Sequence, residues 1–162
     1  MPPRIQWTTR KDRISVADVA ALFRNADWAR ERTRSEIRRM LKHTDILVMA
    51  RSGRKPVGFA RVITDKTFRA FVEDVIVAPE MRRQGLGRLM IEQAEMLVKK
   101  LGIPRMELTS TQTHFWKRLG YRRKTNSTCM VKYLIPVISP PPLRGRTKVG
   151  GSRRPPNLLS NR

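Results

Sequence analysis

Residues 75–88 constrain the fold more than any other part of the sequence, because an apolar strand pattern there runs into a glycine-containing loop and then into an amphipathic helix pattern. Gly85 and Gly87 lack Cβ atoms, so successive backbone N–H groups of the loop can converge on one oxyanion. The N-terminus of the helix adds a partial positive charge, and Arg82, Arg83 and Arg88 add full charges. The segment therefore predicts a phosphate site, with pyrophosphate as the favoured ligand.

Two common phosphate-binding loops do not fit this segment. A P-loop requires a lysine followed by serine or threonine after its last glycine, whereas Gly87 is followed by Arg88 and Leu89. The dinucleotide fingerprint requires a third glycine at the position that Met90 occupies. The pattern that remains is Arg-x-x-Gly-x-Gly, preceded by a strand that ends in Val-x-Pro.

The composition is that of one globular domain with a strong positive charge. The chain has 162 residues, of which 40% are hydrophobic, and a formal net charge of +22. Such a charge attracts nucleic acids, anionic membrane surfaces and phosphorylated cofactors alike. No apolar run of about 18 residues is present, which argues against a membrane-spanning helix. Because the N-terminus has no signal-peptide core and a single cysteine cannot form an intramolecular disulfide, we expect a cytoplasmic protein.

The sequence divides at about Pro136. Residues 1–135 alternate between helix and strand patterns, whereas residues 136–162 are rich in Pro, Gly, Ser and Arg, contain no acidic residue and show no periodicity. We therefore expect a folded domain over residues 1–135 and a disordered basic tail over residues 136–162. The tail is either an unselected extension or an electrostatic tether to an acidic surface.

Hydrophobic periodicity and turn residues predict the element order β-α-α-β-β-β-α-β-α-β-β. Caps at Ser15 and Thr33 begin the first two helices, and Gly102 ends the third. A turn around Asp65 joins the third and fourth strands, and a final hairpin would bury Cys129. The expected strands are residues 5–7, 46–50, 57–63, 68–77, 106–109, 121–124 and 128–135, and the two later helices are residues 85–101 and 113–119.

The loop at residues 82–87 resembles the pyrophosphate loop of the GNAT superfamily of acetyl-CoA-dependent N-acetyltransferases, and the element order over residues 4–135 is similar to that fold. The resemblance implies an α/β fold with a central, mostly antiparallel sheet, a splayed cofactor-binding strand pair and flanking helices. It implies acetyl-CoA as co-substrate. We expect no metal site, because the two histidines and the cysteine show no metal-ligand spacing. The residues that would bind acetyl-CoA are Val75, Ile76, Val77, Arg82, Arg83, Gln84, Gly85, Leu86, Gly87 and Arg88.

Two further segments carry the resemblance. Residues 71–77 are similar to the central strand of glucosamine-6-phosphate N-acetyltransferases, which implies that this backbone holds the pantetheine arm and polarises the thioester carbonyl. Residues 115–121 resemble the late signature Phe-Tyr-x-x-x-Gly-Phe/Tyr. Trp28 lies where many members place an acceptor-site aromatic residue, and Phe115 and Trp116 are further acceptor-site candidates.

Trp116 departs from the family pattern, because the tyrosine that often protonates the departing thiolate would fall there. An indole N–H donates a hydrogen bond but does not give up its proton at neutral pH, so Tyr121 or water would have to substitute. Glu73 and Asp74 are the candidates for the general base. They would point to opposite faces of a regular strand, and Glu73 is favoured, with a purely structural role for both carboxylates as the alternative.

The favoured function is transfer of an acetyl group from acetyl-CoA to a primary amine, on a small molecule or a protein, by direct attack in a ternary complex. One alternative is a nucleic-acid- or ribosome-associated basic binding protein on a GNAT-like fold, and another is a degenerate protein that binds CoA without turnover. Non-specific binding of polyanions to the basic surface and tail is expected, and a homodimer would be typical of the superfamily. A stripe of arginines is either a solvated helix face or a contact for the acceptor or a polyanion; it comprises Arg30, Arg32, Arg34, Arg38 and Arg39.

Overall fold

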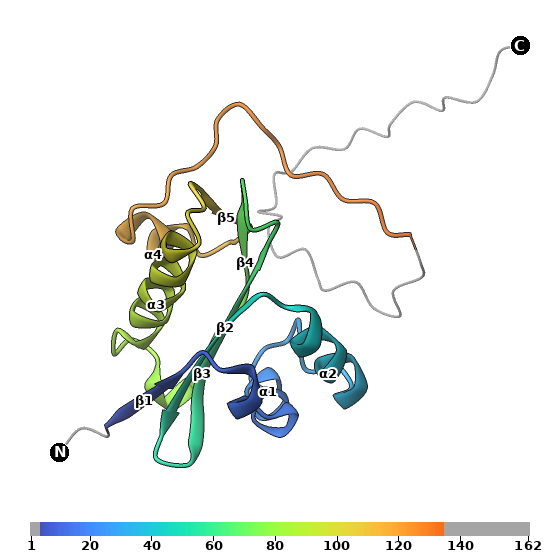
Figure 1. The fold of residues 1–162 in the computed structure, drawn as a ribbon, viewed down its shortest axis with the longest axis vertical. Coiled ribbons are helices and arrows are strands. Elements are labelled where there is room, and N and C mark those ends of the chain that lie inside the picture. Colours follow the sequence, from blue (N-terminus) through green and yellow to red (C-terminus); the bar gives the residue numbers. More distant parts are fainter. Residues whose placement is uncertain (1–3, 135–162) are drawn as a thin grey trace, which may run out of the picture. The chain divides into compact units, whose positions relative to one another are not determined.

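The computed structural model of the chain describes residues 4–134, and all of its helices and strands lie in a unit formed by residues 1–131. The predicted boundary near Pro136 and the tail beyond it lie outside the described residues. Five strands form one sheet in the order β1-β2-β3-β4-β5, antiparallel throughout except for the parallel pair β4–β5 (Figure 1). The strands are β1 (Ile5–Thr8), β2 (Ile46–Ser52), β3 (Lys55–Thr64), β4 (Ala70–Val77) and β5 (Met106–Leu108).

Helices cover both faces of this sheet, with α1 and α2 on one face and α3 and α4 on the other (Figure 1). The predicted caps are confirmed, because Ser15 accepts the N–H of Asp18 and Thr33 forms a reciprocal capping box with Glu36. The α-helices are α1 (Val16–Phe23), α2 (Arg34–His43), α3 (Leu86–Lys100) and α4 (Thr113–Arg118), and the 3-10 turns are η1 (Lys11–Arg13) and η2 (Pro79–Met81). The expected mixed α/β architecture is therefore present.

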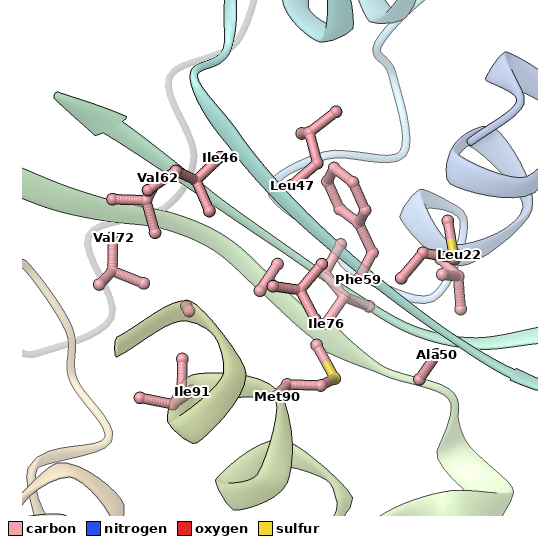
Figure 2. Close-up of a cluster of buried hydrophobic side chains, with 14 of the residues drawn as sticks. Leu22, Ile46, Leu47, Ala50, Phe59, Val62, Val72, Ile76, Met90 and Ile91 are labelled. Carbon is pink, nitrogen blue, oxygen red and sulfur yellow. The ribbon is translucent and has the colours of Figure 1, made fainter. Parts of the chain in front are cut away.

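Buried side chains lie on both faces of the sheet, with Phe59 of β3 on the side of α1 and Met90 of α3 on the other side (Figure 2). Phe59 meets Phe23 of α1 in a T-shaped contact, with ring centroids 6.0 Å apart. Gly58 lies against α3 so closely that an added Cβ would be 2.5 Å from the sulfur of Met90. Because both faces of β3 are buried, its sequence and that of β2 are nearly continuous apolar runs.

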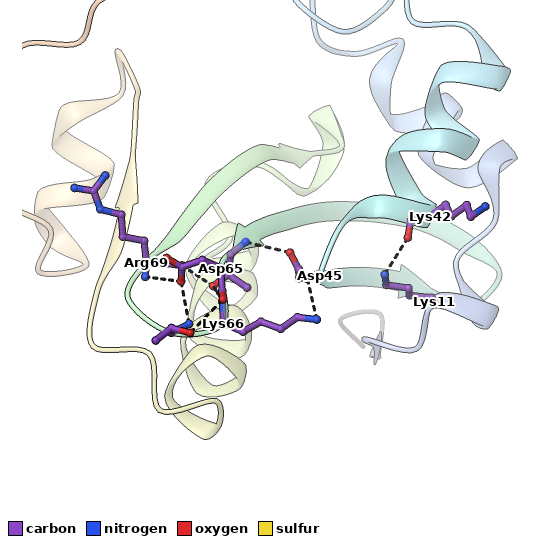
Figure 3. Close-up of polar contacts among 8 residues, drawn as sticks. Lys11, Lys42, Asp45, Asp65, Lys66 and Arg69 are labelled. Carbon is purple, nitrogen blue, oxygen red and sulfur yellow. Dashed lines mark hydrogen bonds and ion pairs between the residues drawn. The ribbon is translucent and has the colours of Figure 1, made fainter.

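A compact turn fixes the register of β3 against β4 (Figure 3). The carboxylate of Asp65 accepts the backbone N–H groups of Thr67 at 2.9 Å, Phe68 at 2.8 Å and Arg69 at 3.0 Å. These backbone hydrogen bonds hold the pKa of Asp65 below its ordinary value. The turn predicted around Asp65 and Lys66 is thus confirmed, and it sets the position of β4 next to β3.

The predicted C-terminal hairpin is wrong, because residues 121–134 contain no strand. The backbone N–H of Tyr121 bonds to the carbonyl of Trp116 at 3.1 Å, so the chain continues from α4 and does not enter the sheet. Cys129, expected to be buried, is exposed. Residues 122–134 are all exposed, so no buried apolar face holds a hairpin at this edge of the sheet.

Candidate functional site

The centre of β4 carries a β-bulge. Between the cross-strand pairs Arg61–Glu73 and Phe59–Ile76, β4 contains one residue more than β3. Asp74 lies in this irregularity with a φ of +49°, a left-handed conformation that is uncommon for residues other than glycine. The bulge changes the directions in which the side chains of this part of the strand point.

Both candidate carboxylates reach the same arginine because of the bulge. The guanidinium of Arg61 lies 3.7 Å from a carboxylate oxygen of Glu73, and its Nε donates a hydrogen bond to Asp74. Arg32 donates a second hydrogen bond to Asp74 at 2.8 Å. Burial nevertheless alternates along β4 through the bulge, with Glu73 half-exposed and Asp74 buried.

The two carboxylates differ in their freedom to act. The side chain of Asp74 is 2% exposed and is paired with two guanidinium groups, whereas the side chain of Glu73 is 37% exposed. Partial burial raises the pKa of Glu73 above its ordinary value; the charge of Arg61 opposes this rise and the charge of Asp74 adds to it. Glu73 is therefore the better placed of the two to take up a proton.

The pairing of β4 with β5 ends before the bulge. The parallel ladder consists of three pairs, from Ala70–Met106 to Val72–Leu108. The residues predicted to hold pantetheine, 75–77, follow the bulge and have no register partner on β5. Their edge of the sheet therefore carries backbone groups that an extended ligand can bind.

The loop between β4 and α3 presents unbonded N–H groups, as expected of a phosphate site. Arg83 has a φ of +60° and Gly85 a φ of +81°, so the chain passes through two left-handed residues before the helix. Unlike α1 and α2, α3 begins without a side-chain cap, and its first turn contains Arg88 and no acidic residue. Leu86 is 3% exposed and anchors this end of the helix in the core. The first-turn N–H groups and the helix dipole therefore favour an anion here.

Arg82 contributes hydrogen bonds that hold this loop in place, in addition to its positive charge. Its Nε donates a hydrogen bond to the carbonyl of Val77 at 3.1 Å, and a terminal nitrogen donates to the carbonyl of Asn25 at 3.4 Å. The first bond joins the loop to the end of β4, and the second joins it to the segment between α1 and α2. Sequence reasoning had assigned Arg82 only an electrostatic role.

The other polar side chains predicted for the loop are exposed. Gln84 donates to the carbonyl of Glu80 at 2.8 Å, and Arg88 pairs with Glu92 one helical turn away at 2.7 Å. Surface pairs of this kind contribute little free energy, so the guanidinium of Arg88 can exchange Glu92 for a phosphate at low cost.

Two of the predicted acceptor-site aromatic residues lie on α4, next to the start of α3. An added Cβ on Gly87 would be 3.5 Å from the ring of Phe115 and 3.6 Å from Val77. Trp116 is 8% exposed and packs edge-on between Phe115 and Tyr121, at centroid distances of 5.0 and 5.1 Å. Phe115 therefore borders the cofactor segment, whereas Trp116 is largely a core residue.

Trp28, the third acceptor-site candidate, belongs to a separate aromatic cluster in the loop between α1 and α2. It is 45% exposed and its ring lies 6.3 Å from that of Phe23. The loop that carries Trp28 approaches β4 through Arg32, which bonds to Asp74.

Sequence reasoning missed Arg61 and placed Arg32 within a surface stripe. One signal was available: Asp74 stands in a strand whose even-numbered positions, from Ala70 to Ile76, are otherwise apolar and buried. A carboxylate at such a position requires a buried cationic partner. Within residues 4–134 no cluster of potential ligands could hold a metal ion, and no helix is long and apolar enough to cross a membrane.

Comparison with known proteins extends these observations. The model of the Acetyltransferase (GNAT) family matches residues 13–121. Curated relatives include a histone acetyltransferase of Glycine max, 30% identical over 121 residues, and a chloroplastic serotonin N-acetyltransferase of Oryza sativa subsp. japonica, 32% identical over 114 residues. These alignments cover 67% and 64% of this chain, and 52% and 56% of the relatives, so the chain spans about half the length of the curated relatives it matches.

Solved structures share the architecture. A GNAT-family acetyltransferase from Streptococcus pneumoniae has a TM-score of 0.69 at 24% identity, over 80% of this chain and 98% of that chain. A glucosamine-6-phosphate N-acetyltransferase from Arabidopsis thaliana has a TM-score of 0.64 at 19% identity, over 82% of this chain and 99% of that chain. At these identities the likeness shows the fold alone. Since the family match runs from the end of η1 through the bulged strand and the loop before α3 to Tyr121, the chain belongs to the GNAT acetyltransferase family.

Proposed function

We propose that this protein transfers an acetyl group from acetyl-CoA to a primary amine, which attacks the thioester directly. The observation that carries the proposal is the start of α3, where left-handed Arg83 and Gly85 precede a helix that lacks a side-chain cap. This anion-binding terminus lies next to the end of β4 that has no β5 partner. An extended ligand with a diphosphate at one end suits that combination.

The residues present fit acetyl-CoA. The first-turn N–H groups of α3, with the charges of Arg82, Arg83 and Arg88, would hold the pyrophosphate. The open edge of β4 at residues 75–77 would hold the pantetheine arm and direct an N–H at the thioester oxygen. Bound acetyl-CoA supplies an acetyl group already activated as a thioester.

Glu73 is the group that would take the proton from the attacking amine. It is half-buried, its pKa is raised, and it stands at the bulge immediately before the proposed pantetheine edge. A base whose pKa lies closer to neutrality accepts a proton more readily than an ordinary surface glutamate. Asp74, paired with two arginines, would hold the bulge in place.

The leaving thiolate would depart without a proton from Trp116. The indole is packed between two aromatic rings and has no proton to give at neutral pH. A thiol has a pKa of about 8.5, so its anion is a stable leaving group near neutral pH and can take a proton from water. Positioning and stabilisation of the thioester oxygen would then supply most of the rate.

The acceptor we favour is a small amine with a single positive charge. The names of two relatives indicate two classes to compare, serotonin and histones. A net charge of +22 repels a lysine-rich histone tail far more strongly than a monovalent amine. An aromatic amine could also use the half-exposed ring of Trp28.

The test measures binding and turnover separately. Titration calorimetry with acetyl-CoA is expected to show one saturable site, and thiol release from acetyl-CoA is expected to rise above its amine-free background with serotonin more than with a histone-tail peptide. No binding of acetyl-CoA would overturn the proposal as a whole. Binding with thiol release at background for a broad panel of primary amines would reduce the protein to a CoA binder.

A second function, binding of nucleic acid, is favoured by the net charge of +22. Affinity for a single-stranded RNA oligonucleotide, measured from about 50 to 200 mM salt, is expected to fall steeply if the contacts are to phosphates. Strong RNA binding together with no acetyl-CoA binding would make this function the better account.

A further inference from the structure

Arg32 turns its guanidinium into the protein, although it stands in a loop otherwise rich in exposed charges. Its central carbon lies 4.9 Å from the ring centroid of Phe23 and 5.3 Å from that of Trp28. A terminal nitrogen donates to Asp74 at 2.8 Å. The side chain is 32% exposed, against 57% for Arg30 in the same loop. Arg32 therefore links the loop between α1 and α2 to β4.

The guanidinium fills the wedge between two aromatic rings. The rings of Phe23 and Trp28 are 6.3 Å apart and inclined at 56°, and Phe23 in turn packs edge-on against Phe59 of β3. A continuous column thus runs from the sheet through Phe23 and Arg32 to the half-exposed Trp28. Each cation–π contact stabilises this arrangement, and more so the further it is desolvated.

The loop of residues 24–33 is held at two points, one on β4 and one on the loop between β4 and α3. Arg32 bonds to the buried Asp74 at its C-terminal end, and Arg82 bonds to the carbonyl of Asn25 at its N-terminal end. Asp74 adjoins Glu73 within the bulge. The contacts of Arg32 are to this carboxylate and to the aromatic rings, and none of them is to the phosphate loop.

We propose that Arg32 is a positioning residue for the acceptor amine: it holds Trp28 and the loop of residues 24–33 against the bulge beside Glu73, and so shapes the acceptor side of the site. This inference rests on the proposed function, because it takes Glu73 as the mark of the acceptor side. It assigns Arg32 no part in binding acetyl-CoA. Arg32 acts on the reaction through the loop and through Trp28, and its charge also lowers the pKa of the neighbouring Glu73.

The matched variants are Arg32→Met and Arg30→Met, which remove the same charge from the same loop. Among residues 4–134, Arg30 pairs only with exposed Asp27 at 3.6 Å and exposed Glu31 at 3.7 Å, so its loss should change little. Arg32→Lys keeps the charge but loses the planar fork and the stacking, so it should fall between wild type and Arg32→Met.

The first measurement needs no acceptor. Hydrogen exchange followed by mass spectrometry is expected to speed up about tenfold in peptides covering residues 24–33 of Arg32→Met, while peptides covering α3 are unchanged. Arg30→Met is expected to exchange like wild type. Equal exchange in all three proteins would overturn the proposal, whether or not the protein acetylates amines.

The second measurement separates the two substrates, with serotonin as acceptor or, if serotonin is inactive, the best amine of the panel. Arg32→Met should raise the KM for the amine about tenfold and leave the KM for acetyl-CoA and the calorimetric affinity for acetyl-CoA within about twofold. Loss of acetyl-CoA affinity, or an equal effect of Arg30→Met, would contradict the assignment. If Arg32→Met does not fold, Arg32→Lys is used in its place. It is expected to show an intermediate rise in the exchange rate of residues 24–33 and in the KM for the amine. If wild type releases thiol only at the background rate with every amine, the proposed function has failed. The hydrogen-exchange result would still show separately whether Arg32 holds the loop.

Discussion

The hydroxyl of Tyr121 donates a hydrogen bond to a carboxylate oxygen of Glu95 on α3 at 3.0 Å. Burial raises the pKa of this phenol above its ordinary value, and the negative charge of Glu95 raises it further. A phenol in this state holds its proton more tightly than a free tyrosine. Tyr121 therefore ties the end of α4 to α3 and is poorly suited to protonate a leaving thiolate.

Tyr121→Phe is expected to lower the free energy of unfolding by about 1 kcal/mol, because one partly buried hydrogen bond is lost. It should leave kcat within about threefold, since the tyrosine takes no part in proton transfer. Urea unfolding and thiol release measure the two effects. Tyr133, which is 55% exposed, provides the control: Tyr133→Phe should change neither quantity. A fall of kcat by about 100-fold in Tyr121→Phe alone would identify Tyr121 as the acid.

The pH dependence of the rate should report Glu73. If Glu73 is the base, it must be ionised to act, so kcat falls as the pH falls through its pKa. Partial burial raises that pKa, and the acidic limb should therefore lie above the ordinary glutamate value of 4.5. Glu73→Gln should remove the limb and lower kcat by about 10²–10⁴. Asp12→Asn, at an exposed site on η1, is the control and should preserve the profile.

Asp74→Asn tests the direction in which the acidic limb of the kcat profile moves. The negative charge of Asp74 raises the pKa of Glu73, and its removal also frees Arg61 to face Glu73 more closely. Both effects favour the ionised form of Glu73, so the acidic limb should move to lower pH. A limb that stays in place in Asp74→Asn and in Glu73→Gln would mean that another group titrates there.

The contact between β3 and α3 gives a prediction about stability. A Cβ on Gly58 would lie 2.5 Å from the sulfur of Met90, a side chain that is fully buried. Gly58→Ala should therefore lower the free energy of unfolding by about 1–3 kcal/mol through overpacking. Met90→Ala alone should cost about 2–5 kcal/mol through a cavity, and the double variant should cost clearly less than the two single effects together. Strict additivity in urea unfolding would contradict the packing described here.

Local signals in the sequence were sufficient for most of the fold. The caps at Ser15 and Thr33 and the left-handed glycine after α3 are fixed by interactions within a few residues, and all were predicted correctly. The left-handed Gly85 before α3 belongs to the same class, because its conformation depends on the adjacent helix terminus, whereas phosphate binding by this loop stays a prediction. These features need no knowledge of distant parts of the chain.

The errors arose where a long-range partner decides the structure. Arg32 and Asp74 are 42 residues apart, and nothing near either of them in sequence indicates that they bond. The bulge at Asp74 likewise leaves no mark in the sequence pattern, because burial still alternates along β4. The apolar alternation after Thr128 predicted a strand, but a terminal strand also needs a buried face, and residues 128–134 are all exposed.

The two ends of α3 provide the most direct test of the phosphate loop. Gly85 before the helix has a φ of +81° and Gly102 after it a φ of +72°, and an added Cβ would touch no other group at either position. Alanine is strained at both, so Gly85→Ala and Gly102→Ala should lower the free energy of unfolding by a similar amount, about 1–2 kcal/mol. The two variants are therefore matched in backbone strain. They differ in that the predicted phosphate site lies at the Gly85 end of α3.

Only the change at Gly85 should weaken the binding of acetyl-CoA. Relief of strain at Gly85 turns the N–H groups of the first turn of α3 away from the position where they converge, whereas the C-terminal end of α3 carries no part of the phosphate site. Calorimetry should show a loss of affinity of about tenfold or more for Gly85→Ala and no loss for Gly102→Ala. Equal losses would mean that destabilisation of α3 accounts for the effect, and no loss in either would place the pyrophosphate elsewhere than at this helix terminus.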